Sequence, residues 1–344
     1  MFRPLLRKSI PSNFRTRTFT KRPFGSSHSS PSQFLPPVRV LGPSLWCLTA
    51  ASAVYLGCAA YEVHQDAKRL KRARSATKAQ FSYEDLSAST TTSWMRGLYS
   101  DLHGDGHQSR SQSQSQPTLD PASLAGMWQN QSSTQKLTIG AIGVNASIYG
   151  ACRLVPSTYH HFAHAAAGGA NYTLFTSMFG HGGATHLFFN MYALYNFAEP
   201  VAASRTFRRS ASHLAAFYLS AGILASLAQH LAGLWPVPMG RTIPSLGASG
   251  AIMALLGAFG ASYPNHNIGI IFIPVSFPAE QALAGIALFE AYGLFIGKWM
   301  RLGHAAHLAG LVLGSGYVYL DGNTRLWEPA RRFTFNEMRR LKMV

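Results

Sequence analysis

Six apolar segments, rich in glycine and alanine and poor in charge, occupy most of the chain after residue 136. Several approach the ~20 residues that a helix needs to cross a bilayer, and small residues let such helices pack closely. The segments are 137–155, 184–203, 212–235, 248–263, 279–297 and 303–320. The pattern predicts an all-α polytopic membrane protein with a six-helix core at 136–321, and it disfavours a large soluble helical domain.

A further apolar segment, 41–63, precedes this core and is followed by the basic run KRLKRAR. It predicts one extra amino-terminal transmembrane helix, a 1+6 arrangement. The region 64–135 is polar and contains SQSQSQ, which is typical of a disordered linker. The proline-broken stretch 264–278 predicts a loop or re-entrant piece, and 322–344 predicts a basic tail.

The charge of the chain is strongly positive, +17, and the first acidic residue is Glu62. An acid-free amino terminus rich in Arg and Ser, here 1–40, is typical of an organellar transit peptide. The alternative is a basic tail that binds nucleic acid, but no nucleic-acid motif follows, so we expect no such partner. The three cysteines form no CxxC pair, which argues against a disulfide framework or a zinc cluster.

Polar residues mark the same end of three predicted helices. The second, fourth and sixth helices run in one direction, so their amino-terminal ends share one side of the membrane. His186 and Asn190 lie early in the second, Ser249 opens the fourth, and His307 lies one turn into the sixth. Alone, a serine or histidine in such a helix is usually a packing residue. Together at similar depth, where partners are scarce, they predict a functional site.

Residue type and position suggest a role for each group. Ser249 at a helix amino terminus suits a nucleophile, because the helix dipole favours the negative charge that its attack creates. His307 is the best-placed base, and His186 and Asn190 can donate to an oxyanion. Small residues face one another on the fourth and sixth helices and allow close approach. They are Gly250, Ala254, Gly257 and Ala261 on the fourth, and Gly310 and Gly314 on the sixth.

Glu290 lies in the middle of the fifth segment, and His304 lies three residues before His307. An acidic residue in the middle of a membrane span is by default a candidate functional residue. We expect Glu290 to pair with His304 and orient the sixth helix; a protonated structural acid and a third catalytic group remain alternatives. Two histidines and one glutamate are residue types that bind metals, but HExxH is absent and we predict no metal site.

Three motifs in 137–320, GASG around Ser249, HGGATHLFFN at 181–190 and AHLAGL at 306–311, resemble the signatures of rhomboid intramembrane serine proteases. YLSAGI, PSLGASGAIM, IIFIP and HAAHL resemble the mitochondrial, presenilin-associated rhomboid-like branch. The resemblance implies Ser249 as nucleophile and His307 as general base. It also implies an oxyanion hole of His186, Asn190 and the Ser249 N–H.

The same resemblance assigns supporting places to other residues and shows two departures. His181 would hold the loop before the second helix, while Gly247 and Gly250 flank the serine. Many rhomboids carry a Trp-Arg pair where this chain reads ANYTLFTSMF. Many also have an aromatic residue where this chain has Met253, whose thioether can still contact an imidazole. Both departures concern loop stability and substrate preference and remove no reacting group.

The expected activity is cleavage of transmembrane segments of proteins anchored in the mitochondrial inner membrane, within the lipid bilayer and without a cofactor. Alternatives are a catalytically inactive rhomboid-like protein that binds or escorts transmembrane clients, and a small transporter. The connector 297–303 would cover the site with Trp299 and Met300. The distribution of Lys and Arg predicts that both ends of the core face the matrix. If the amino terminus of the chain is also in the matrix, however, the one extra span would put the start of the core on the other side of the membrane. The two arguments conflict.

Overall fold

A computed structural model describes residues 37–73, 81–103, 121–234, 243–271, 273–296 and 303–344. Most of the predicted transit peptide and almost all of the predicted covering loop, including Trp299 and Met300, lie outside these residues. Within them the chain is mostly helical, with one two-stranded sheet.

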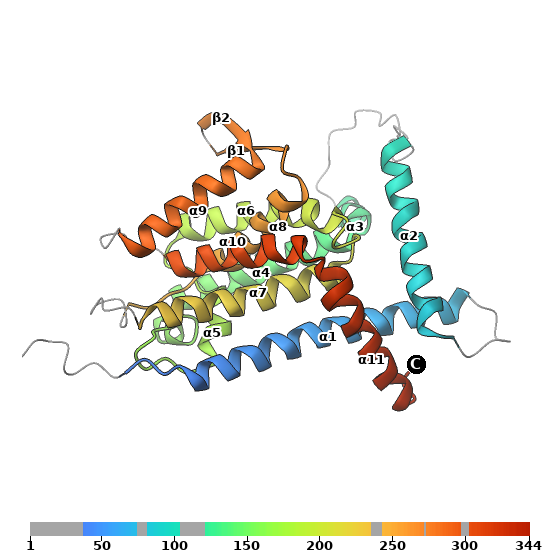
Figure 1. Ribbon diagram of the computed structural model, residues 1–344, viewed down its shortest axis with the longest axis horizontal. Helices are drawn as coiled ribbons and strands as arrows, with labels where there is room; N and C mark the ends of the chain where they lie inside the picture. Colours follow the sequence, from blue (N-terminus) through green and yellow to red (C-terminus); the bar gives the residue numbers. More distant parts are fainter. Residues whose placement is uncertain (1–36, 74–80, 104–120, 235–242, 272, 297–302) are drawn as a thin grey trace, which may run out of the picture. The chain divides into compact units, whose positions relative to one another are not determined.

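All six predicted core segments are helices (Figure 1). They are α4 (Ser133–Leu154), α6 (Ala184–Ala203), α7 (Ala211–Ala232), α8 (Ser249–Ser262), α9 (Ala279–Phe295) and α10 (His304–Tyr319). The most extensive core contact joins α8 to α10, and α8 also packs on α6, α7 and α9. The helix that begins with Ser249 is therefore surrounded by core helices, and most of its residues are buried.

Length and composition single out two of the described helices, α1 (Leu41–Ala73) and α7, as long and apolar enough to cross a membrane; α8 is a shorter apolar helix. The predicted helix at 41–63 is thus present and extends by ten residues. The count of one plus six membrane spans stays a prediction. Local signals set several starts: Ser132 and Gln135 form a capping box before α4, and the Ser210 side chain accepts from the His213 N–H before α7.

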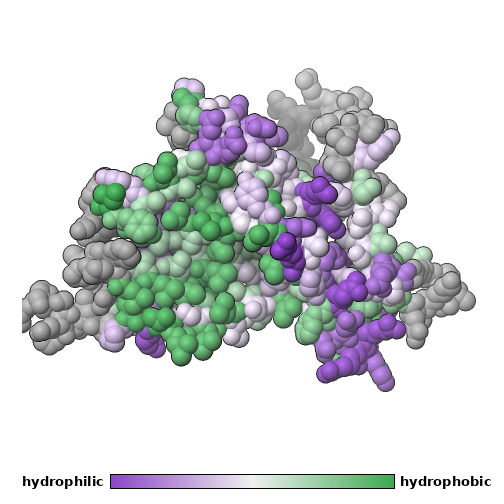
Figure 2. Space-filling view, in the orientation of Figure 1, coloured by the Kyte–Doolittle hydropathy of each residue, from purple (hydrophilic) through white to green (hydrophobic). Residues whose placement is uncertain are grey.

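The predicted disordered linker is wrong for its described residues, which continue α1 and form α2 (Tyr83–His103) and α3 (Pro121–Asn130). The predicted tail likewise contains α11 (Glu328–Arg340). Hydrophilic surface gathers around α11 (Figure 2). A few apolar side chains order these polar helices, because Leu86 and Tyr83 of α2 pack against Val63 of α1 and Phe335 of α11. Such sparse apolar positions are hard to distinguish from a solvated segment in sequence.

A buried arginine joins the first helix to the last. Arg331 of α11 is 1% exposed and lies 3.4 Å from a Glu62 oxygen, 2.9 Å from Asp66 and 3.3 Å from Glu328. Tyr83 of α2 donates to the same Glu328 side chain at 2.5 Å. A buried guanidinium is tolerated only when carboxylates surround it in this way, so these contacts fix α1 against α11.

The stretch 264–278 is not simply a loop, because its described residues form an antiparallel pair, β1 (Asn267–Ile270) and β2 (Ile273–Pro278). Ile268 pairs with Phe277 and Gly269 with Ser276, and the register shifts after Gly269. The prolines that suggested a loop lie at the ends of the pair or near its turn, where a missing N–H is tolerated. Short helices fill the connection between α4 and α6: η2 (Pro156–His161), α5 (Thr173–Thr176) and η3 (Ser177–Phe179); a π-turn, η5 (Asn323–Trp327), precedes α11.

Candidate active site

The helices α8 and α10 approach so closely that the glycines at their contact have no room for a side chain. A Cβ at Gly310 would lie well inside van der Waals contact with the Gly250 carbonyl oxygen, and one at Gly314 would meet that of Ala254. On α8, a Cβ at Gly257 would strike the Leu311 carbonyl. The predicted small-residue stripes therefore face each other, and their contact brings the starts of the two helices together.

Ser249 and His307 meet at this end of the pair. The Ser249 Oγ lies 2.7 Å from His307 Nε2, and the His307 side chain is 14% exposed. A hydroxyl can donate to an imidazole at that distance. Ser249 is also the first residue of α8, which has no side-chain N-cap bond, so the positive end of the helix dipole lies at the serine. This is the arrangement needed for base-assisted attack by a hydroxyl.

Glu290 of α9 contacts both histidines of α10 through separate oxygens. Its Oε1 lies 2.9 Å from His307 Nδ1, and its Oε2 lies 2.6 Å from His304 Nδ1. Glu290 is 3% exposed and His304 is 4% exposed. Glu290 thus contacts His304, the partner that we expected. It also contacts His307, the candidate base. No group of three metal-binding side chains suited to an ion occurs among the described residues.

His186 lies beside the backbone that leads to Ser249. A Cβ at Gly247 would be 2.9 Å from both His186 Cε1 and Nε2, and 3.8 Å from Ser249 Oγ. Gly247 has φ +123°, a conformation in which a side chain would be strained. Two constraints therefore require glycine at this position, and the absence of a side chain lets the His186 ring lie against the backbone that leads to Ser249.

Asn190 is buried on the same helix, one turn after His186. Its Nδ2 donates to the His186 carbonyl at 2.8 Å, and its Oδ1 is buried with no hydrogen-bond partner among the described groups. The predicted oxyanion donor therefore uses one amide hydrogen within its own helix. Residue spacing alone could not indicate this local bond.

His181 lies in the loop before α6 and stacks edge-on against His186, with ring centroids 5.1 Å apart. Its Nδ1 lies 3.3 Å from the Phe179 carbonyl oxygen. Burial, and then the neighbouring His186, lower the pKa of His181 to about 4. At neutral pH His181 is therefore an uncharged packing partner for His186. Met253, one turn after Ser249, has its Cβ against α10 at Gly310.

Contacts that sequence reasoning missed hold the serine loop in place. The Gly247 N–H donates to the Ser177 carbonyl at 2.9 Å. Ser245 and His164 exchange backbone hydrogen bonds of 2.9 and 2.8 Å as an isolated bridge. Burial is the main cause that lowers the pKa of His164 to about 4, and its ring contacts His230 of α7 at 2.9 Å. A lone bridge between two loops has no periodic pattern by which to predict it.

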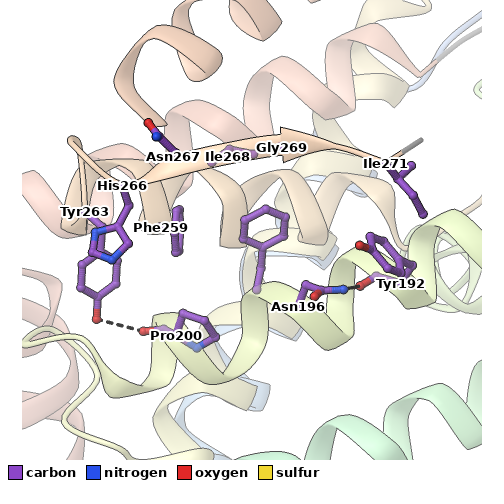
Figure 3. A pocket seen from close by; sticks show the side chains of 11 residues that line it. Tyr192, Asn196, Pro200, Phe259, Tyr263, His266, Asn267, Ile268, Gly269 and Ile271 are labelled. Carbon is purple, nitrogen blue, oxygen red and sulfur yellow. Dashed lines mark hydrogen bonds between the residues drawn. The ribbon is translucent and has the colours of Figure 1, made fainter. Parts of the chain in front are cut away.

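A cavity of about 550 Å³ lies away from this cluster, beside the carboxyl-terminal part of α8 (Figure 3). Its lining comes from α6, α8, β1 and the residues next to β1, and it includes Tyr192, Phe259 and His266. The Tyr263 hydroxyl at its edge donates to the Pro200 carbonyl at 3.1 Å. The cavity contains none of the Ser249, His307 and Glu290 cluster, so we do not assign it to the same chemistry.

Comparison with known proteins bears on the same region. Residues 168–324 match the Rhomboid domain. The chain is 32% identical over 207 residues to the rat protein named presenilin-associated rhomboid-like protein, mitochondrial, covering 58% of this chain and 52% of the relative. It is 30% identical over 223 residues to zebrafish presenilin-associated rhomboid-like protein A, mitochondrial, covering 62% and 55%. It is 28% identical over 191 residues to yeast rhomboid protein 1, mitochondrial, covering 53% and 52%. The chain spans about half the length of these relatives.

Proposed function

We propose that this chain, which carries a rhomboid domain at 168–324, is an intramembrane serine endopeptidase. The observation that carries the proposal is the 2.7 Å contact between Ser249 Oγ and His307 Nε2 at the amino-terminal ends of two tightly packed helices. A rhomboid-like protein that only escorts clients does not need this alignment of a hydroxyl and a base.

The first half of the reaction follows from the geometry. Ser249 Oγ attacks the carbonyl carbon of the scissile bond, and its proton passes to His307 Nε2. The oxyanion that forms lies near the start of α8, where the Ser249 N–H and the helix dipole favour negative charge. His186 beside Gly247 is the proposed side-chain donor, and Asn190 can add its second amide hydrogen.

The second half reverses these roles. Protonated His307 gives its Nε2 proton to the departing amine, which leaves an acyl ester on Ser249. Water then attacks that ester while His307 accepts a proton from the water, and collapse of the intermediate releases the acid and restores the serine. The chain needs no cofactor for these steps.

The proposed substrates are transmembrane segments of membrane-anchored proteins. The three relatives are all named as mitochondrial, and we propose the mitochondrial inner membrane as the location. A substrate segment containing Gly or Pro has a weaker helix and unwinds at lower cost. We therefore expect cleavage near such residues.

Labelling with a fluorophosphonate tests the proposal most directly. Wild-type protein should be labelled on Ser249 and should cleave a transmembrane reporter, whereas Ser249→Ala should abolish labelling and lower cleavage by more than about 10³-fold. Ser262→Ala, at the other end of the same helix, is the matched control and should keep both activities. Absence of both labelling and cleavage in correctly folded wild-type protein would favour the client-binding alternative.

A further inference from the structure

We propose that Arg39, a residue before the first helix, is a positioning residue for the candidate nucleophile. Residues 37–40, here called the entry segment, lead into α1. A chain of hydrogen bonds runs from the Arg39 backbone through two buried histidines to Ser245, which lies four residues before Ser249. The proposal deepens the protease assignment and rests on it for its kinetic consequences.

The chain of contacts begins at a backbone carbonyl. The Arg39 carbonyl oxygen lies 2.6 Å from Nε2 of His230, in the last turn of α7. The other ring nitrogen of His230, Nδ1, lies 2.9 Å from His164 Nε2. Both histidines are 2% exposed, so water cannot replace a lost partner. The two rings therefore connect the entry segment to the loop between α4 and α6.

His164 continues the connection to the serine loop, residues 245–248. Its backbone and that of Ser245 exchange hydrogen bonds of 2.9 and 2.8 Å, and the Ser245 hydroxyl also donates to the His164 carbonyl at 3.2 Å. The helix α8 begins with Ser249 where this loop ends. The position of the candidate nucleophile therefore depends on where the loop is held.

The available hydrogens set the direction of these bonds. A carbonyl oxygen only accepts, so His230 Nε2 carries a hydrogen, and in the uncharged ring the lone pair is on Nδ1. His164 must then donate from its Nε2. Burial, followed by the neighbouring His230, lowers the pKa of His164 to about 4, so at neutral pH its ring has no second hydrogen. Each ring thus directs its one hydrogen towards Arg39, and loss of that acceptor leaves a buried donor unpaired.

The entry segment contacts the core at two further points. The Arg39 side chain donates from Nη2 to the Gly169 carbonyl at 2.9 Å. Val38 is buried, and its Cγ2 would lie 3.6 Å from a Cβ at Gly233, just after α7. Residues 38 and 39 thus belong to the fold, although the sequence alone predicts a leader over 1–40. We therefore expect the mature protein to begin at or before Val38.

Hydrogen exchange tests the connection without any enzyme activity. In full-length protein in detergent, the Ser245 N–H should exchange about tenfold faster in His230→Leu than in wild type, because His164 loses the partner that holds it. His160→Gln is the matched control. The His160 ring is exposed in the same loop and lies against His161, so its loss should leave exchange at Ser245 unchanged.

Two other substitutions at His230 separate the two ends of its ring. A glutamine amide reaches the place of Nε2 and can donate to the Arg39 carbonyl, whereas an asparagine amide reaches only the place of Nδ1, which faces His164. Exchange at Ser245 should therefore stay closer to wild type in His230→Gln than in His230→Asn. The opposite order would show that the entry segment does not hold the loop.

Labelling of Ser249 with a fluorophosphonate provides the kinetic arm. The final extent of labelling counts folded protein, whereas its rate reports how well the serine is placed. His230→Asn should slow the rate by about 10- to 100-fold, and His230→Gln should recover it to within about fivefold of wild type, all with the same final extent. His160→Gln should label within about twofold of the wild-type rate. A reduced final extent with an unchanged rate would indicate simple destabilisation and would overturn the proposal.

The amino terminus of the mature protein is the third measurement. Mass spectrometry of protein purified from its native membrane should find the first residue at or before Val38. A mature protein that begins after Arg39 and is labelled at the full rate would contradict the proposal, as would unchanged exchange at Ser245 in His230→Asn. If wild type is neither labelled nor able to cleave, the protease assignment fails, and hydrogen exchange still decides whether the entry segment holds the serine loop.

Discussion

Two helices flank His307, and they are attached to α10 in opposite ways. On the α8 side, backbone lies against backbone, and Gly310 and Gly314 have no space for even a methyl group. On the α9 side, a buried acid contacts two histidines, while neighbouring apolar residues of α9 face outwards. Leu288 is 72% exposed and Phe289 is 47% exposed, and Ala279 and Glu290 are the residues of α9 that are buried.

The difference separates distance from orientation. Close packing against α8 sets how far the histidine lies from the serine, because both side chains project from helices whose backbones touch. The contacts from α9 hold the orientation of the histidine ring, because Glu290 lies 2.9 Å from His307 Nδ1. Damage to the first contact should therefore remove the reactive pair, and damage to the second should leave the pair in place with a poorer base.

The largest effect should come from a methyl group on the α8 side. In Gly310→Ala the new Cβ would press on the Gly250 carbonyl, and backbone cannot rotate away as a side chain can. We expect a loss of about 1–3 kcal/mol in stability and about 10²-fold slower labelling of Ser249. Gly316→Ala on the same helix, with nothing within 4 Å of its Cβ, is the control. Equal labelling rates and melting temperatures for the two variants would refute the packing argument.

A smaller effect is expected on the α9 side. The Cβ of Gly293→Ala would press on the His304 ring, which can tilt but then weakens its bond to Glu290. We expect kcat to fall by about tenfold, the cost of roughly 1.4 kcal/mol, with stability nearly unchanged because alanine favours a helix. Gly285→Ala, with free space at its Cβ, should stay fully active. A stability loss as large as that of Gly310→Ala would contradict the distinction between the two sides.

The smallest effect concerns α7, which touches the start of α10. Gln229 accepts the Ala306 N–H at 3.2 Å, and α10 has no side-chain N-cap bond of its own. Gln229→Leu should cost about 1 kcal/mol of stability, as for a lost cap, and lower the cleavage rate only a few-fold. Gln281→Leu, exposed on α9, is the comparison, and thermal melts with reporter cleavage measure both. A loss as severe as in Gly293→Ala would mean that α7, rather than α9, orients His307.

Chain direction made the serine and histidine predictable. Helices that run in the same direction have their amino-terminal ends on the same side of the membrane. Ser249 and His307 could therefore be paired without any known distance, and the spacing of the glycines predicted which helix faces are in contact. The contact from Glu290 to His307 was harder, because α9 is apolar nearly all round and its rotation leaves no pattern in sequence. The sequence led us to expect His304 as the partner of Glu290, and the two side chains do lie in contact; a catalytic contact for the acid was only one of the alternatives.

Other regions escaped prediction for different reasons. The polar helix α2 is held in place by a few buried residues such as Leu86. The average composition of a segment does not reveal so small a number of apolar residues. The β1–β2 pair depends on pairing across a turn, and proline masked its strand pattern. Asn190 turned its amide towards its own helix, a choice of side-chain rotamer that residue type does not reveal.

The contact between Arg331 and Asp66 links residues 265 positions apart in the chain. During synthesis Asp66 is made long before Arg331, so this bond can form only after a further 265 residues have been added. Until then the carboxylates of α1 lack the guanidinium that balances them when buried. The contact between α1 and α11 is thus made only after the core between the two residues has been synthesised, which makes it a late step in assembly.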